Sequence, residues 1–94
     1  MQLKWLKKAL HNLDDEASYS AADSAAAAQL VVQRVLESVA FLQEQPGLGR
    51  PGRVPGTREL SVPKTRLVVP YWVRGEVVEI LRVFHTSRRL PARW

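Results

Sequence analysis

Apolar residues in the first half of the chain recur at the three-and-four spacing of helices. Between Leu6 and Ala17 they fall on one helical face, with acidic residues toward the other. A second and clearer helix begins in the alanine run at 25–28 and ends before Pro46. The break at 19–24 offers serine and aspartate side chains that can cap a helix start. Because this break is short, we expect the two helices to form an antiparallel hairpin.

The pattern changes to alternation in the second half, which predicts strands. Alternating segments at 58–62 and 66–74 are followed by a turn at Gly75 and by a nearly continuous apolar run at 77–85. A continuous run is typical of a strand that is buried on both of its faces. Pro70 lies inside the second segment, where it has no N–H to donate, so we expect a bulge or an unpaired edge there.

The order of these elements predicts an α+β fold in a single domain, residues 1–94. An N-terminal helix hairpin packs on a three- to four-stranded antiparallel sheet, and Gln2–Trp5 is either the fourth strand or the lead-in to the first helix. The segment 46–56 separates helices from strands and holds four glycines and three prolines. A loop of this length is expected to be functional or mobile.

Composition and charge indicate where the protein is located and what kind of surface it binds. The chain has no cysteine, and none of its apolar runs approaches the roughly 18 consecutive residues of a membrane span, so the expected location is the cytoplasm. Residues 1–49 carry a formal charge of −2 and residues 50–94 carry +7, mostly as arginine. We expect this basic half to face phosphates or an acidic protein surface.

Several common kinds of site find no support in the sequence. His11 and His85 lie far apart, and no carboxylates show the spacing of metal ligands. The glycines of the 46–56 loop lack the lysine and serine that end a phosphate-binding loop. No serine has the flanking residues of a nucleophile elbow. We therefore expect neither a metal nor a cofactor.

What remains is a group of arginines beside one histidine, a combination that suits cleavage of a phosphodiester without metal. Such cleavage needs a base, an acid and cations around one phosphate, and the candidates are Arg58, Arg66, Arg82 and His85. Positions 82 and 85 point to opposite faces of a regular strand, so both serve one site only if the strand ends or twists between them. The alternatives are a structural Arg82 paired with Glu79 or Glu59, and a His85 with an ordinary strand-end hydrogen bond.

A second set of residues is a candidate for binding a target. Trp72 shares strand parity with Arg66 and Arg74, so it offers a stacking surface beside cations, and the alternative is a tryptophan packed in the core. Arg88 and Arg89 add charge in the short tail. We expect the arginines of the second half to gather into one exposed cationic face, backed by the two helices.

Four segments of the chain resemble the RelE/ParE toxin superfamily, in matching order over nearly the whole length. They are Gln45–Gly52, Gly56–Leu60, Val69–Val73 and Val78–His85. The resemblance implies a microbial-RNase-like fold, a growth-arresting activity and a cognate antitoxin protein. That antitoxin is expected to lay an amphipathic helix on this chain in a hetero-oligomer, and any binding of operator DNA is expected to occur through the antitoxin.

The superfamily has two branches that act on different targets. RelE-like members cut messenger RNA on the ribosome, whereas ParE-like members inhibit DNA gyrase and are not nucleases. The ending Arg82–Ser87 resembles ParE-like chains, and the RelE-like terminal tyrosine is missing, although Arg88 and Arg89 stand where ParE-like chains commonly hold Met and Asp. The resemblance therefore favours a gyrase inhibitor. A ribosome-dependent mRNA endonuclease is the alternative, and a degenerate member that only binds its antitoxin is a third hypothesis.

Overall fold

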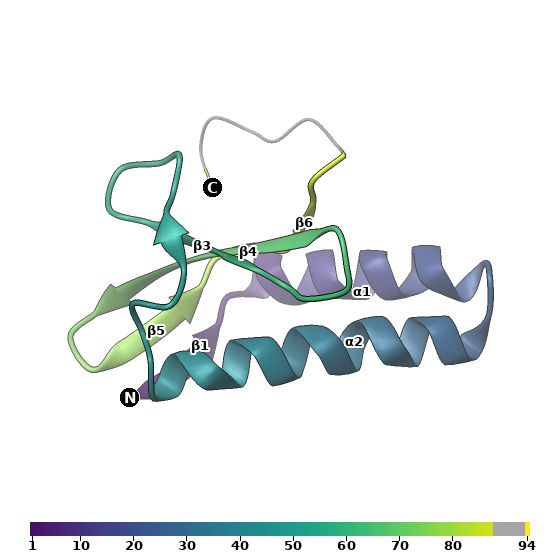
Figure 1. Ribbon diagram of the computed structural model, residues 1–94, viewed down its shortest axis with the longest axis horizontal. Helices are drawn as coiled ribbons and strands as arrows, with labels where there is room; N and C mark the ends of the chain where they lie inside the picture. The colour runs from purple at the N-terminus through teal and green to yellow at the C-terminus, as the bar shows by residue number, and fades with distance from the viewer. Residues whose placement is uncertain (88–93) are drawn as a thin grey trace.

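The computed structural model describes residues 1–87 and Trp94, in which a helix hairpin packs against a twisted sheet (Figure 1). In chain order the elements are β1 (Gln2–Trp5), α1 (Lys7–Ala21), α2 (Ala25–Ala40), the 3-10 turn η1 (Phe41–Gln43), β2 (Arg50–Pro51), β3 (Arg58–Ser61), β4 (Leu67–Arg74), β5 (Val77–Ile80) and β6 (Phe84–His85).

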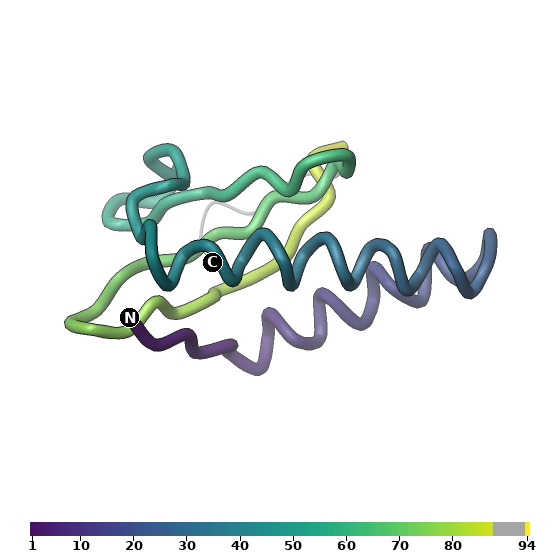
Figure 2. The backbone as a smooth tube through the Cα atoms, turned by 60° about the horizontal axis from the view of Figure 1, so that its bottom comes forward, coloured from purple at the N-terminus to yellow at the C-terminus, as the bar shows by residue number. Residues whose placement is uncertain are grey.

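The helix hairpin forms where the hydrophobic pattern predicts it. α1 follows Leu6, whose N–H donates to the Ile80 carbonyl at 3.0 Å and so fixes the start of the helix against the sheet. α2 follows Ser24, whose Oγ accepts the Ala27 N–H at 2.9 Å, the bond that an N-cap residue makes. The two helices run antiparallel along their whole length (Figure 2).

The strands form one mixed sheet in the order β1-β5-β4-β3-β2, with β6 also paired to β4. The predicted α+β fold with a helix hairpin on one face of the sheet is confirmed (Figure 1). The sheet has more strands than expected, and it is not wholly antiparallel because β1 runs parallel to β5, from Gln2 opposite Val77 to Trp5 opposite Ile80. The direction of β1 depends on the path of the chain through the helices, which a pattern of four residues does not encode.

The apolar run at 77–85 is two strands with a bulge between them. The β4–β5 ladder ends with Tyr71 opposite Ile80, and the β4–β6 ladder begins with Val68 opposite Phe84. Two residues of β4 therefore lie opposite three residues of the partner segment, which is the definition of a bulge. Pro70 is one of the two, and its carbonyl accepts a hydrogen bond of 3.0 Å from the bulged segment. The expected bulge or unpaired edge is therefore not in β4, which is continuous from Leu67 to Arg74, and the bulge lies in the segment opposite Pro70.

The core lies between the helices and the sheet, because alternate strand residues point to the same side. In β4 the odd-numbered residues face the helices, and the even-numbered ones face the opposite side, here called the outer face. The largest fully buried members of this core are Tyr71, Leu42, Ile80, Val35, Val39, Val62, Val69, Val78 and Val83.

The second helix leaves much of its apolar surface uncovered. Together with η1 it spans Ala25–Gln43, 19 residues with a mean hydropathy of 1.3, which by length and composition alone is enough to cross a membrane. Val35 and Val39 are instead buried against the sheet, while Leu36 and Phe41 are exposed. In an isolated chain this leaves an apolar strip that a protein partner can cover.

Candidate functional site

Arg58 lies on the helix-facing side of the sheet, where it holds the 46–56 loop. Its Nη1 donates to the Gly49 carbonyl at 2.8 Å. The Tyr71 hydroxyl, on the strand beside it, accepts the Gly49 N–H and donates to the Pro46 carbonyl, both at 2.8 Å. Burial raises the pKa of this hydroxyl above its usual value. The Gly49 N–H and the charge of Arg58 lower the pKa, but their effect is smaller. Arg58 and Tyr71, on adjacent strands, therefore both hold the 46–56 loop against the sheet.

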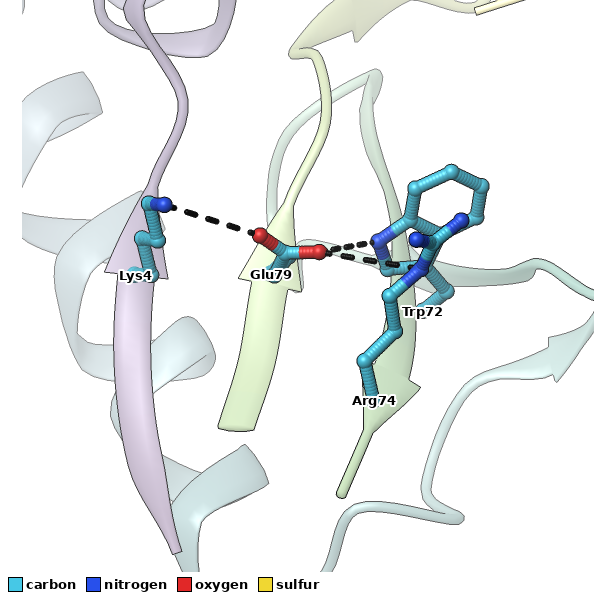
Figure 3. A network of polar contacts seen from close by, with 4 residues as sticks. All are labelled: Lys4, Trp72, Arg74 and Glu79. Atoms are coloured by element: carbon cyan, nitrogen blue, oxygen red, sulfur yellow. Dashed lines mark hydrogen bonds and ion pairs between the residues drawn. The ribbon is translucent and has the colours of Figure 1, made fainter. Parts of the chain in front are cut away.

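Trp72 and Arg74 come together on the outer face around one carboxylate (Figure 3). The Trp72 indole Nε1 donates to Glu79 Oε1 at 2.7 Å, and the Arg74 guanidinium stacks 3.8 Å from the centre of the indole ring. Glu79 also pairs with Arg74 at 3.8 Å and with Lys4 of β1 at 3.9 Å. Both basic side chains are about two-thirds exposed, 64% in each case, so this cluster presents a stacked, cationic surface to solvent.

Arg82 lies where the bulge meets α1, and two of its guanidinium nitrogens donate hydrogen bonds there. Its Nε donates to Asn12 Oδ1 at 2.8 Å, and its Nη1 donates to the main-chain carbonyl of Trp94 at 3.2 Å. The same Asn12 oxygen accepts the Val83 N–H at 3.1 Å, and the guanidinium stacks over the ring of Phe84 at 4.6 Å. The arginine has a structural role, but its partner is an amide of α1 rather than the Glu79 or Glu59 considered from the sequence.

His85 faces the helix side of the sheet, opposite Leu67. Its Nδ1 accepts the Ser87 N–H at 3.2 Å and lies 2.6 Å from the Ser87 hydroxyl. Because the backbone N–H requires a lone pair on Nδ1, the neutral ring carries its proton on Nε2. Arg66 and His85 line the same pocket, of about 190 Å³, at this end of the sheet.

The four candidate groups for phosphodiester cleavage do not converge on one phosphate. Arg58 pairs with Tyr71 and His85 pairs with Leu67, four residues away along β4, which corresponds to roughly 13 Å. The described residues also do not form the predicted single cationic face. Arg58 lies on the helix-facing side of the sheet, whereas Arg74 lies on the outer face. Alternating strand residues divide the arginines between both faces. Arg88 and Arg89 lie outside the described residues.

The sequence does not predict where Trp94 lies. Its ring packs against Phe84 on the outer face with centroids 5.4 Å apart, and its indole N–H donates to Thr57 Oγ1 at 3.3 Å. It thereby closes one side of a cleft of about 390 Å³ whose walls include Trp72 and Leu81. No local pattern indicates these contacts, since Thr57 lies 37 positions before Trp94 and Phe84 comes from a different element.

An apolar groove of about 430 Å³ lies between the end of α2 and β3. Phe41 and Leu48, 59% and 50% exposed, stand on its wall, and Leu60 of β3 contributes to its lining. Arg50 of the lining, with a side chain that is 67% exposed, pairs at 3.6 Å with Glu59, a buried acid that lines the same groove. We call this the α2–β3 groove. Within residues 1–87 and Trp94, no group of three or more His, Cys, Asp or Glu side chains is placed to hold a metal ion.

Comparisons with known proteins point to one family. The family model described as ParE toxin of type II toxin-antitoxin system, parDE, matches residues 3–90. A curated protein of Sinorhizobium fredii, named "Putative toxin Y4kP", is 38% identical over 90 residues, covering 96% of this chain and 93% of that protein. A solved structure of a chromosomal ParDE TA system from P. aeruginosa has a TM-score of 0.84 at 34% identity, covering 90% of this chain and 95% of that one.

Proposed function

Because the chain belongs to the ParE toxin family of type II toxin–antitoxin systems, we propose that it arrests growth by inhibiting DNA gyrase and that its cognate antitoxin silences it. The proposal follows the ParE-like branch of the superfamily, which the closing segment Arg82–Ser87 resembles. The protein then acts by binding, and its basic half serves as a contact surface.

The observation that supports this target best is the separation of the candidate catalytic groups. Cleavage without metal needs an acid, a base and cations within reach of one phosphate. Here Arg58 donates to the Gly49 carbonyl, and Arg82 donates to Asn12, so neither guanidinium is directed toward His85. A binding toxin does not require these groups to meet.

We place the gyrase contact on the outer face around Glu79, and we expect Arg88 and Arg89 of the tail to contribute to it. Tryptophan and arginine carry a large share of binding energy at protein interfaces. Trp72 and Arg74 form such a pair, already stacked at 3.8 Å and held by Glu79. Their arrangement is therefore formed before the partner arrives, which reduces the entropy lost on binding.

Purified protein tests this proposal in a gyrase supercoiling assay. Arg74→Gln is expected to raise the half-inhibitory concentration at least about tenfold, the equivalent of about 1.4 kcal/mol. Arg53→Gln, a change of the same charge at an exposed residue of the 46–56 loop, serves as the matched control and should inhibit like the parent. If the parent protein leaves supercoiling intact and cuts ribosome-bound messenger RNA, the endonuclease alternative is correct.

We further propose that the antitoxin covers the α2–β3 groove. β2 pairs with β3 only at Arg58 and Glu59, so the remaining edge of β3 has no neighbouring strand among the described residues. Apolar side chains of an antitoxin helix or strand would fill the space beside Phe41 and Leu48, and an acidic residue would pair with Arg50. Such a partner also covers part of the apolar strip that α2 exposes.

Co-expression with the antitoxin tests the groove. Phe41→Asp places a charge where an apolar side chain is expected to dock, so this variant should arrest growth even when the antitoxin is present. Leu10→Asp, at a residue of α1 that is 49% exposed and outside the groove, is the control and should still be silenced. Retained toxicity shows that each variant folds. Full neutralisation of Phe41→Asp would place the antitoxin on another surface.

A further inference from the structure

The pocket beside His85 is surrounded by basic residues from separate elements. Arg34 comes from α2, Lys64 and Arg66 come from the turn between β3 and β4, and His85 comes from β6. Glu16 of α1, which is 5% exposed, is the one carboxylate among the described lining residues. Three basic residues against one acid give the lining a formal charge of +2 with a neutral histidine. We call this the Lys64 pocket.

Lys64 has a backbone conformation that favours glycine. Its φ is +62°, and it is the one non-glycine residue with a positive φ among the described residues. The turn runs from Val62 to Thr65, closed by a 3.2 Å bond from the Thr65 N–H to the Val62 carbonyl, with Pro63 at its second position. A turn with this arrangement prefers glycine at its third position. The chain has lysine there instead, which puts a strained residue with a cationic side chain on the pocket wall.

Hydrogen bonds hold the turn that forms one wall of the pocket. Arg34 Nη1 donates to the Lys64 carbonyl at 3.2 Å, which ties α2 to the turn. The Thr65 hydroxyl donates to the Val62 carbonyl at 2.9 Å and accepts the Leu67 N–H at 3.0 Å, so the turn is fixed on both sides. These bonds fix the backbone of the turn and one nitrogen of Arg34, so less of the wall has to become ordered when an anion enters.

We propose that the Lys64 pocket binds a single phosphate group, carried by inorganic phosphate or by a phosphomonoester. Its volume of about 190 Å³ equals the liquid volume of about six water molecules, which admits a compact anion. Arginine matches the oxygens of phosphate with two parallel N–H groups, and lysine adds a point charge. His85 contributes an Nε2 proton, because Ser87 occupies Nδ1. The inference is independent of the gyrase target, since it rests on this pocket alone.

Isothermal titration with sodium phosphate tests the proposal on the whole chain, with sodium chloride at matched ionic strength as the reference. The parent protein should bind one phosphate per chain and melt at a higher temperature in its presence. Lys64→Gly removes the charge and relieves the positive φ, so it should weaken phosphate binding at least tenfold and raise the melting temperature measured without phosphate. Lys8→Gln, an exposed lysine of α1 outside this pocket, should bind phosphate like the parent.

The two outcomes of Lys64→Gly separate a ligand site from a structural role. A more stable protein that binds phosphate weakly supports the proposal, because loss of folding cannot explain the weaker binding. Phosphate binding that is unchanged in Lys64→Gly, or that sodium chloride reproduces in the parent, overturns it. Phosphoserine and a nucleoside 5′-monophosphate then identify the source of the group. Tighter binding of either ester assigns an ester ligand, and tighter binding of inorganic phosphate assigns the free ion.

Discussion

Tyr71 is the residue whose single hydroxyl joins the loop to the sheet. It is fully buried, and its oxygen satisfies both the Gly49 N–H and the Pro46 carbonyl. Removing it leaves two backbone groups without a partner, which costs about 1–3 kcal/mol. Tyr71→Phe should therefore lower the free energy of unfolding by that amount in urea titrations, whereas Tyr19→Phe, at a residue 68% exposed, should cost less.

The same hydroxyl makes stability depend on alkaline pH. Its pKa in the folded protein lies above the usual tyrosine value of 10.0, mainly because burial disfavours the phenolate. The unfolded chain therefore loses this proton at a lower pH than the folded one, so the stabilisation is fully present below pH 10 and declines as the pH rises toward the folded-state value. The decline should be absent from Tyr71→Phe. If the free energy of unfolding falls equally at alkaline pH in the parent and in Tyr71→Phe, other groups cause the decline.

The candidate site is predictable from the sequence only where its residues lie on one strand or at the paired ends of two strands. Arg74 and Trp72 do stack on one face, as strand parity indicates, and Arg66 and His85 do line one pocket. The partners of the other arginines are distant: Arg82 reaches Asn12, 70 positions away. Such partners depend on how elements pack, so the pattern of one segment cannot identify them.

At the scale of elements, the 46–56 loop is less free than its glycines suggest. An added Cβ at Gly49 would lie 2.7 Å from the Tyr71 ring and 3.0 Å from the Glu59 carbonyl, whereas one at Gly47 would meet nothing within 4 Å. Gly49→Ala should therefore destabilise the protein by about 1–3 kcal/mol. Gly47→Ala should leave stability unchanged or raise it by up to about 1 kcal/mol. Thermal unfolding of both variants checks this, and equal effects would mean that the loop is not clamped at Gly49.

The sheet illustrates what hydrophobic periodicity can and cannot specify. Alternation correctly locates β3 and β4, the continuous apolar run covers β5 and β6, and the bulge lies opposite Pro70. The run at 77–85 reads as one strand because its bulge residues, Leu81 and Val83, are themselves buried and apolar. The parallel direction of β1 follows from the connection through the helices. Burial can therefore be read from the sequence, whereas strand direction and register depend on the assembled fold.

At the scale of the whole molecule, a charge of +7 in the second half does not produce one cationic face. Strands place successive side chains on opposite sides, so the arginines of β3 and β4 separate. The result is a stacked cluster on the outer face, a basic pocket at one end of the sheet and an apolar groove along its edge. In the proposed function the first surface contacts the target and the third contacts the antitoxin, and the pocket is the proposed phosphate site.

Induced expression without the antitoxin tests the central claim most directly, with plasmid topology and messenger RNA length measured in the same culture. A toxin that acts by binding gyrase needs no proton transfer at His85. The parent and His85→Ala should therefore both arrest growth, with plasmid supercoiling reduced and messages intact. Cleaved messages in the parent culture, together with normal growth of His85→Ala, would contradict this account and identify the protein as a ribonuclease.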